Sequence, residues 1–78
     1  MDRVTGRIVR IMVNRETRER SGYGFVQADG GEDYFLHASE LDKDGPGWGE
    51  LQVGARVEFT PTDGPRGLRA VEARILGE

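Results

Sequence analysis

Short runs of apolar and β-branched residues, separated by glycine-rich turns, follow one another along the whole chain. The turn signals are Asp-Gly-Gly at 29–31, a Gly/Pro segment at 44–47 and Asp-Gly-Pro at 63–65. Residues 38–44 fit one short helical turn at most, which Gly45 and Pro46 end. The runs predict five β-strands, at residues 4–13, 23–28, 33–38, 55–60 and 68–76. An all-β fold, a small barrel or sandwich, is therefore expected.

The last two runs alternate as strands do when one face is buried and the other meets water. In the fourth run Val57 and Phe59 alternate with polar residues. In the fifth run Val71, Ala73 and Ile75 do the same. These five side chains are predicted to point into the core.

The second and third runs depart from this pattern because they carry apolar residues on both faces. Tyr23 and Phe25 share one face of the second run, and Val26 lies on the other. Phe35 and His37 share one face of the third run, while Tyr34 and Leu36 already supply the core on the other. The turn at 29–31 joins the two runs as a hairpin. Aromatic residues on the face away from the core predict a binding surface.

Length and composition limit the chain to one small domain, residues 1–78. It contains no cysteine, so disulfides and cysteine metal sites are excluded. No apolar run approaches the roughly 20 residues that span a bilayer, and the first residues lack the apolar stretch of a secretory signal. We expect a cytoplasmic protein without membrane contact, and a monomer is favoured.

Charge is unevenly distributed along a chain whose net charge is −3. Residues 1–20 hold six arginines and three acidic residues, whereas residues 21–78 hold five basic and eleven acidic residues. The asymmetry predicts a basic edge on an acidic body. An uneven but merely solvated surface is the alternative.

Two segments resemble the ribonucleoprotein motifs of the cold-shock domain. Residues 21–26, Ser-Gly-Tyr-Gly-Phe-Val, resemble the first motif, and residues 34–39, Tyr-Phe-Leu-His-Ala-Ser, resemble the second. Residues 6–12, 51–59 and 64–70 resemble other parts of the domain, in the same order. The resemblance implies a five-stranded antiparallel Greek-key OB-fold barrel that binds single-stranded RNA or DNA. It further implies an RNA chaperone or transcript-level regulator, with a mild preference for pyrimidine-rich strands.

The predicted site combines stacking side chains with cations, as single-stranded nucleic acid requires. The residues are Arg10, Ile11, Tyr23, Phe25, Phe35, His37 and Trp48. The aromatic residues and His37 would stack on bases, Arg10 would meet a phosphate, and Ile11 would offer apolar contact. Each residue also has an interpretation without a binding role: a core position for the Phe residues, a rim position for Tyr23, and solvated side chains for Arg10 and His37.

The chain departs from the family pattern in its first strand and in two loops. Residues 10–12 are Arg-Ile-Met where the family has Lys-Trp-Phe, and Ala38 replaces a Phe. These losses predict weaker stacking on bases. The long loop at 14–21 contains three arginines that could meet phosphates, or a salt-bridged loop whose glutamates cancel them. Trp48 could stack on a base, or fold onto the end of the barrel.

Catalysis has little support in the sequence. The Cβ atoms of His37 and Ser39, two residues apart on a strand, would lie about 7 Å apart, which exceeds hydrogen-bond reach for a nucleophile and its base. A lone histidine without cysteine makes a metal site improbable. We expect no enzyme, no cofactor and no metal.

Two other functions stay open at this point. One is a protein-interaction module on the same fold, because two stacking positions are lost and the body is acidic. The other is an accessory domain of a larger enzyme.

Overall fold

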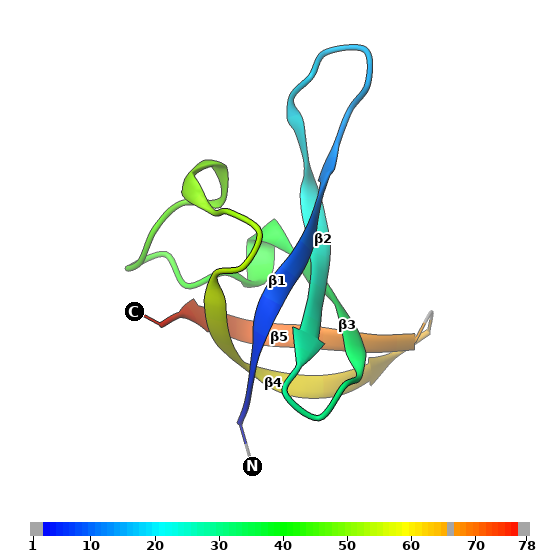
Figure 1. The fold of residues 1–78 in the computed structure, drawn as a ribbon, viewed down its shortest axis with the longest axis vertical. Helices are drawn as coiled ribbons and strands as arrows, with labels where there is room; N and C mark the ends of the chain where they lie inside the picture. Colours follow the sequence, from blue (N-terminus) through cyan, green and yellow to red (C-terminus); the bar gives the residue numbers. More distant parts are fainter. Residues whose placement is uncertain (1–2, 66, 77–78) are drawn as a thin grey trace.

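Five strands curl around a single core in the computed structural model, which describes residues 3–65 and 67–76 (Figure 1). The strands are β1 (Val4–Val13), β2 (Arg20–Ala28), β3 (Asp33–His37), β4 (Arg56–Gly64) and β5 (Gly67–Ile75). Two single turns of 3-10 helix lie between β3 and β4, η1 (Ala38–Glu40) and η2 (Trp48–Glu50). All five predicted strands are confirmed. The turn expected within 38–44 corresponds to η1, and η2 was not predicted.

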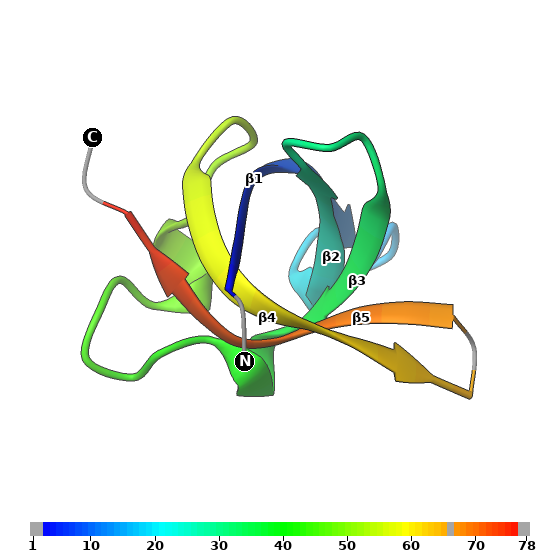
Figure 2. The same cartoon turned by 90° about the horizontal axis from the view of Figure 1, so that it is seen from below.

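The strands form a closed barrel in the order β1-β2-β3-β5-β4. β1 pairs with β2 and β4, β2 with β3, and β4 with β5, all antiparallel. The closing contact between β3 and β5 is parallel and is short. Seen from below, β4 and β5 extend past β3 toward the hairpin that joins them (Figure 2). The predicted OB-type barrel is confirmed, with this one parallel pairing.

The barrel interior is filled by side chains from every strand. Its largest fully buried members are Phe59, Ile8, Leu36, Val26 and Val57. The ring of Tyr34 packs beside that of Phe59, with 5.0 Å between ring centroids. Val26, Tyr34 and Leu36 therefore supply the inner faces of β2 and β3, as the alternation predicts.

Close packing of β1 against β2 requires glycine at two positions. A Cβ atom at Gly24 would clash with the backbone carbonyl of Arg10, and one at Gly6 would clash with the carbonyl of Gln27. Gly24 lies between Tyr23 and Phe25, so its missing side chain lets β1 approach the strand that carries both aromatic residues.

β5 does not follow the alternation that its sequence predicts. Ala70 and Ala73 are buried, whereas Val71 and Ile75 are only partly buried. Glu72 between them adopts a left-handed backbone conformation with φ of 52°. Its N–H group donates to Oε1 of Glu40 over 3.2 Å. The inward prediction is confirmed for Ala73 and is only partly met by Val71 and Ile75, because this local twist changes the spacing from two to three.

Asp29 anchors the β2–β3 turn to the neighbouring strands. Its carboxylate accepts hydrogen bonds from both terminal nitrogens of Arg56, over 3.0 and 3.1 Å, and from the Thr5 hydroxyl over 2.7 Å. The hydrogen bonds from Arg56 and then Thr5 lower the pKa of Asp29 from 3.8 to about 2. Charge-assisted bidentate contacts of this kind fix geometry strongly, so they hold the hairpin that joins the two aromatic strands.

Candidate nucleic-acid interface

An aromatic cluster covers the outer face of β2 and β3, and its members are Tyr23, Phe25, Phe35 and His37. Tyr23 pairs with His37 across the strands, and Phe25 pairs with Phe35. Paired residues of neighbouring strands point to the same face of a sheet. The four side chains predicted to form a platform are therefore brought together. A core position for the two Phe residues, the alternative reading, does not occur in the structure, because both are partly exposed.

The rings of the cluster contact one another at tilted or edge-to-face angles. The centroids of Tyr23 and Phe35 are 5.4 Å apart, and those of Tyr23 and Phe25 are 6.4 Å apart. Phe35 and His37 are also separated by 6.4 Å. Tyr23, Phe25 and Phe35 are partly exposed and His37 is exposed, so solvent reaches part of each ring. Open faces on neighbouring rings are what successive unpaired bases need for stacking.

A β-bulge in β1 aims Arg10 at this cluster. Ile8 pairs with Val26 inside the barrel, but the next pair along is Arg10 with Phe25, so Val9 is the extra residue. Without the bulge, Arg10 would share the inner face with Ile8, since side chains alternate. Instead Arg10 is exposed and lies beside the Phe25 row.

The same bulge turns Ile11 inward. Ile11 pairs with Gly24, whose backbone is buried, and its side chain packs against the core. The structure therefore does not bring Ile11 to the aromatic cluster, where the sequence predicts it. Its contact with nucleic acid stays a prediction that this geometry does not support.

Arg69 is a site residue that the sequence reasoning missed. Its position on β5 pairs with Phe35 of β3, which places it in the same row as Phe25 and Arg10. An arginine thus flanks the Phe25–Phe35 pair at each end of the row. By alternation Arg69 shares a face with Val71 and Ala73, which the sequence assigns to the core, so the strand pattern does not indicate an outward position for it.

His37 and Ser39 are closer together than their sequence spacing predicts. The Nδ1 atom of His37 lies 2.9 Å from the Ser39 hydroxyl, and it accepts the backbone N–H of Ser39 over 3.1 Å. The prediction that the two side chains lie beyond hydrogen-bond reach is wrong, because the chain leaves β3 at His37 and enters η1. The imidazole caps this turn. Since Nδ1 accepts, the ring proton lies on Nε2, which is a donor for a ligand.

Trp48 lies apart from the aromatic cluster. It is partly buried and packs against the core, and its Nε1 atom is buried with no hydrogen-bond partner in the described part of the chain. Its backbone carbonyl accepts a hydrogen bond from Arg20 over 2.6 Å. This position is the one expected if the indole folds onto the barrel. Contact with nucleic acid stays a prediction for Trp48.

The long β1–β2 loop forms a hairpin that projects beyond the barrel (Figure 1). The Asn14 side chain accepts the N–H groups of Glu16 and Thr17, over 2.8 and 3.3 Å. Among the described residues, neither Arg15 nor Arg18 is within ion-pair distance of a carboxylate. The salt-bridged loop considered from the sequence is therefore not the arrangement observed.

Two further features of the described residues bear on function. Within 3–65 and 67–76, no group of three or more potential metal ligands lies close together. No helix in these same ranges has the length and apolar character needed to cross a bilayer.

Fold and surface together define a class: small five-stranded barrels with an exposed aromatic face flanked by arginines. Comparison with known proteins makes the assignment specific. The family model described as the "'Cold-shock' DNA-binding domain" matches residues 15–75. The chain belongs to the cold-shock domain family, and it is a nucleic-acid-binding module of that kind. The matched segment begins after β1, so Arg10 and Ile11 lie outside it.

Relatives and a solved structure agree with this assignment. The cold shock-like protein CspA of Stigmatella aurantiaca is 46% identical over 59 residues, covering 74% of this chain and 84% of that protein. The major cold shock protein of Micrococcus luteus is 48% identical over 56 residues, covering 70% and 81%. The structure of Drosophila Unr CSD456 is similar with a TM-score of 0.71 at 23% identity, over 97% of this chain and 27% of that one. This last similarity supports the fold alone.

Proposed function

We propose that this protein is a non-enzymatic module that binds short single-stranded RNA or DNA on its aromatic cluster. The observation that carries the proposal is the pairing of Tyr23 with His37 and of Phe25 with Phe35 on an outer, partly exposed face. Aromatic residues on the solvent side of a sheet contribute little to the core, whereas they match the faces of unpaired bases.

In this proposal the bases stack on the four rings, and the Nε2–H group of His37 donates to a base or phosphate. Arg10 and Arg69 lie at the two ends of the Phe25–Phe35 row, where they meet the phosphate backbone or the edge of a base. A stretch of about four to eight bases matches the range for one OB-fold. In the cell, such binding fits an RNA chaperone or transcript-level regulator.

The test is a titration of dye-labelled oligothymidine with the protein, followed by anisotropy and repeated over a salt series. We expect binding that weakens as salt rises, with a shallow slope that corresponds to a few phosphates. The intrinsic fluorescence of Trp48, recorded in parallel, reports whether the indole meets the ligand. Absence of binding at low salt would refute the proposal, and capture of a protein partner that is insensitive to salt would favour the protein-interaction module.

A further inference from the structure

A pocket of about 610 Å³ lies on the outer face, at the edge of the aromatic cluster. Its apolar lining comes from Phe25 and Phe35 on one side and from Leu68 on the β4–β5 hairpin on the other. Leu68 is 40% exposed, so part of its side chain is accessible to a ligand in the pocket. A cavity of this size with aromatic walls accommodates a flat heterocycle.

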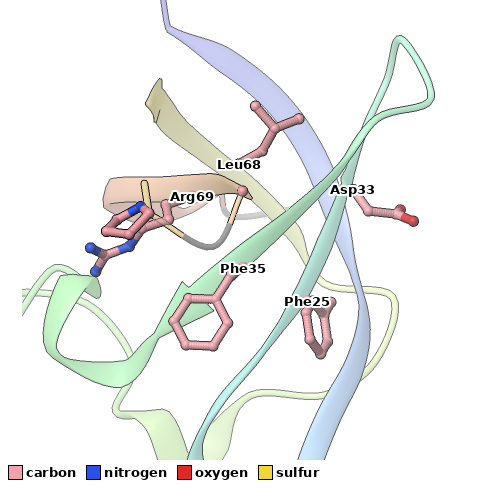
Figure 3. A pocket seen from close by; sticks show the side chains of 7 residues that line it. Phe25, Asp33, Phe35, Leu68 and Arg69 are labelled. Carbon is pink, nitrogen blue, oxygen red and sulfur yellow. The ribbon is translucent and has the colours of Figure 1, made fainter. Parts of the chain in front are cut away.

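Two side chains of opposite charge complete the lining of the pocket. Arg69 and Asp33 both belong to it (Figure 3), and the picture shows the guanidinium to one side of the two Phe rings and the carboxylate to the other. Neither side chain has a hydrogen-bond or ion-pair partner among residues 3–65 and 67–76. The N–H donors of the Arg69 guanidinium and the acceptor oxygens of the Asp33 carboxylate are thus free on opposite sides of the two Phe rings.

The position of Arg69 is set by the two strands beside β5. It pairs with Phe35 on β3 and with Thr62 on β4. A methyl group at Gly64 would overlap the aliphatic stem of Arg69, so the glycine makes the space through which this stem passes. Arg69 therefore keeps its position next to Phe35, and the β4–β5 hairpin does not displace its side chain.

The four common bases differ in how their donors and acceptors are arranged. Guanine has two adjacent acceptors, O6 and N7, on one edge, and two adjacent donors, N1–H and N2–H, on another. A guanidinium matches the first edge in a bidentate way, and a carboxylate matches the second. Thymine and uracil offer a single donor between two acceptors, and cytosine and adenine place their amino group beside an acceptor on one edge.

We propose that this pocket is a guanine subsite, in which Arg69 reads the O6/N7 edge and Asp33 reads the N1/N2 edge of a base stacked against Phe35. The inference rests on the proposed function and adds a base preference at one position of the bound strand. Each of the two bidentate contacts is expected to discriminate by about five- to 150-fold against a base that cannot make it.

The test compares labelled oligothymidine with the same strand carrying one central guanine, adenine or cytosine, at one salt concentration. We expect only the guanine strand to bind about tenfold or more tightly than oligothymidine. Two analogues then separate the contacts without any protein variant. Replacing guanine by 7-deazaguanine removes N7, one of the two acceptors for Arg69, and replacing it by inosine removes the N2 amino group, one of the two donors for Asp33. Each is expected to lose part of the preference.

Protein variants complete the assignment. Arg69→Gln and Asp33→Asn are each expected to reduce the guanine preference several-fold while leaving the melting temperature unchanged, because neither side chain belongs to the core. Two control variants remove the same kinds of charge at neighbouring positions: Arg74→Gln on the same strand as Arg69, and Glu32→Gln beside Asp33. Both controls are expected to keep the guanine preference.

The outcomes separate this proposal from the previous one. Binding of oligothymidine without a gain from guanine would overturn the guanine subsite and leave the aromatic interface standing. An equal loss of affinity for all strands in Arg69→Gln would make Arg69 a phosphate contact and also overturn it. Absence of binding to every strand would remove the proposed function itself.

Discussion

Phe25 on β2 and Phe35 on β3 are direct cross-strand partners on the outside of the barrel, with 6.0 Å between ring centroids and an interplanar angle of 73°. Both rings are partly exposed, while the inner faces of the same strands are filled by Val26, Tyr34 and Leu36. The pair therefore contributes to a surface that is separate from the core, and it can be altered without removing the interior packing.

Replacing both rings, Phe25→Ala with Phe35→Ala, is expected to lower the affinity for oligothymidine by about 2–6 kcal/mol. Each ring that stacks on a base contributes about 1–3 kcal/mol. The variant should still unfold in one cooperative transition by circular dichroism. Val53→Ala, which truncates a side chain that is 63% exposed, serves as the matched control. An unchanged affinity in the double variant would move the binding site elsewhere.

Trp48→Phe separates a structural role of the indole from a binding role. The substitution removes a buried N–H group that has no partner among the described residues, which is favourable by about 1–3 kcal/mol, but it also loses packing against the core. Since the two effects oppose, we expect the free energy of unfolding to change by no more than about 1 kcal/mol, with oligothymidine affinity unchanged. Denaturant titration and anisotropy measure both quantities. A clear loss of affinity at unchanged stability would place the indole on the ligand.

Gly24→Ala is expected to destabilise the barrel by about 1–3 kcal/mol, the usual range for forced overpacking. The added methyl group would clash with the carbonyl oxygen of Arg10 and push β1 away from β2. Affinity should fall as well, because Arg10 would move away from the Phe25 row. Gly49→Ala, where an added Cβ meets no atom within 4 Å, is the control. Equal melting temperatures for the two variants would contradict the close approach of the strands.

Acid should selectively weaken the Asp29–Arg56 contact. The pKa of Asp29 is lowered from 3.8 to about 2 in the folded protein, so its ionised form is stabilised by folding. The contribution is present above a pH of about 4 and is lost as the pH falls through about 2. We expect the melting temperature of Asp29→Asn to lie below that of the parent protein at neutral pH. The two melting temperatures should converge as the pH approaches 2. Glu19→Gln, an exposed carboxylate on the β1–β2 hairpin, should show no such convergence.

The aromatic motifs and the strands could be predicted from the sequence because each depends on neighbouring residues only. Alternation over a few residues separates the outer Phe25 and Phe35 from the inner Val26 and Leu36, and the Asp-Gly-Gly turn implies that the two strands pair. This was enough to predict the hairpin, the shared face and the family resemblance. Only the proximity of His37 to Ser39 was misjudged here, because the strand ends at His37 and not one residue later.

Alternation by itself does not reveal positions that depend on a break in the strand pattern. A simple count of alternate residues from Ile8 would place Arg10 inside and Ile11 outside, whereas the bulge at Val9 reverses both. In β5 the left-handed conformation of Glu72 changes which residues are buried. Bulges of this kind arise when several strands must close a barrel together, so a period of two cannot reveal them.

By itself, the sequence determined the number of strands, their approximate bounds and the aromatic face, because each follows from neighbouring residues and from turn chemistry. The tertiary structure alone decided three things: the choice of the inward position for Trp48, the inward packing of Ile11, and the position of Arg69 beside Phe35. The last pair is brought together by the parallel contact that closes the barrel between β3 and β5. Such a contact depends on how all five strands fit around one core, and no short stretch of the chain encodes it.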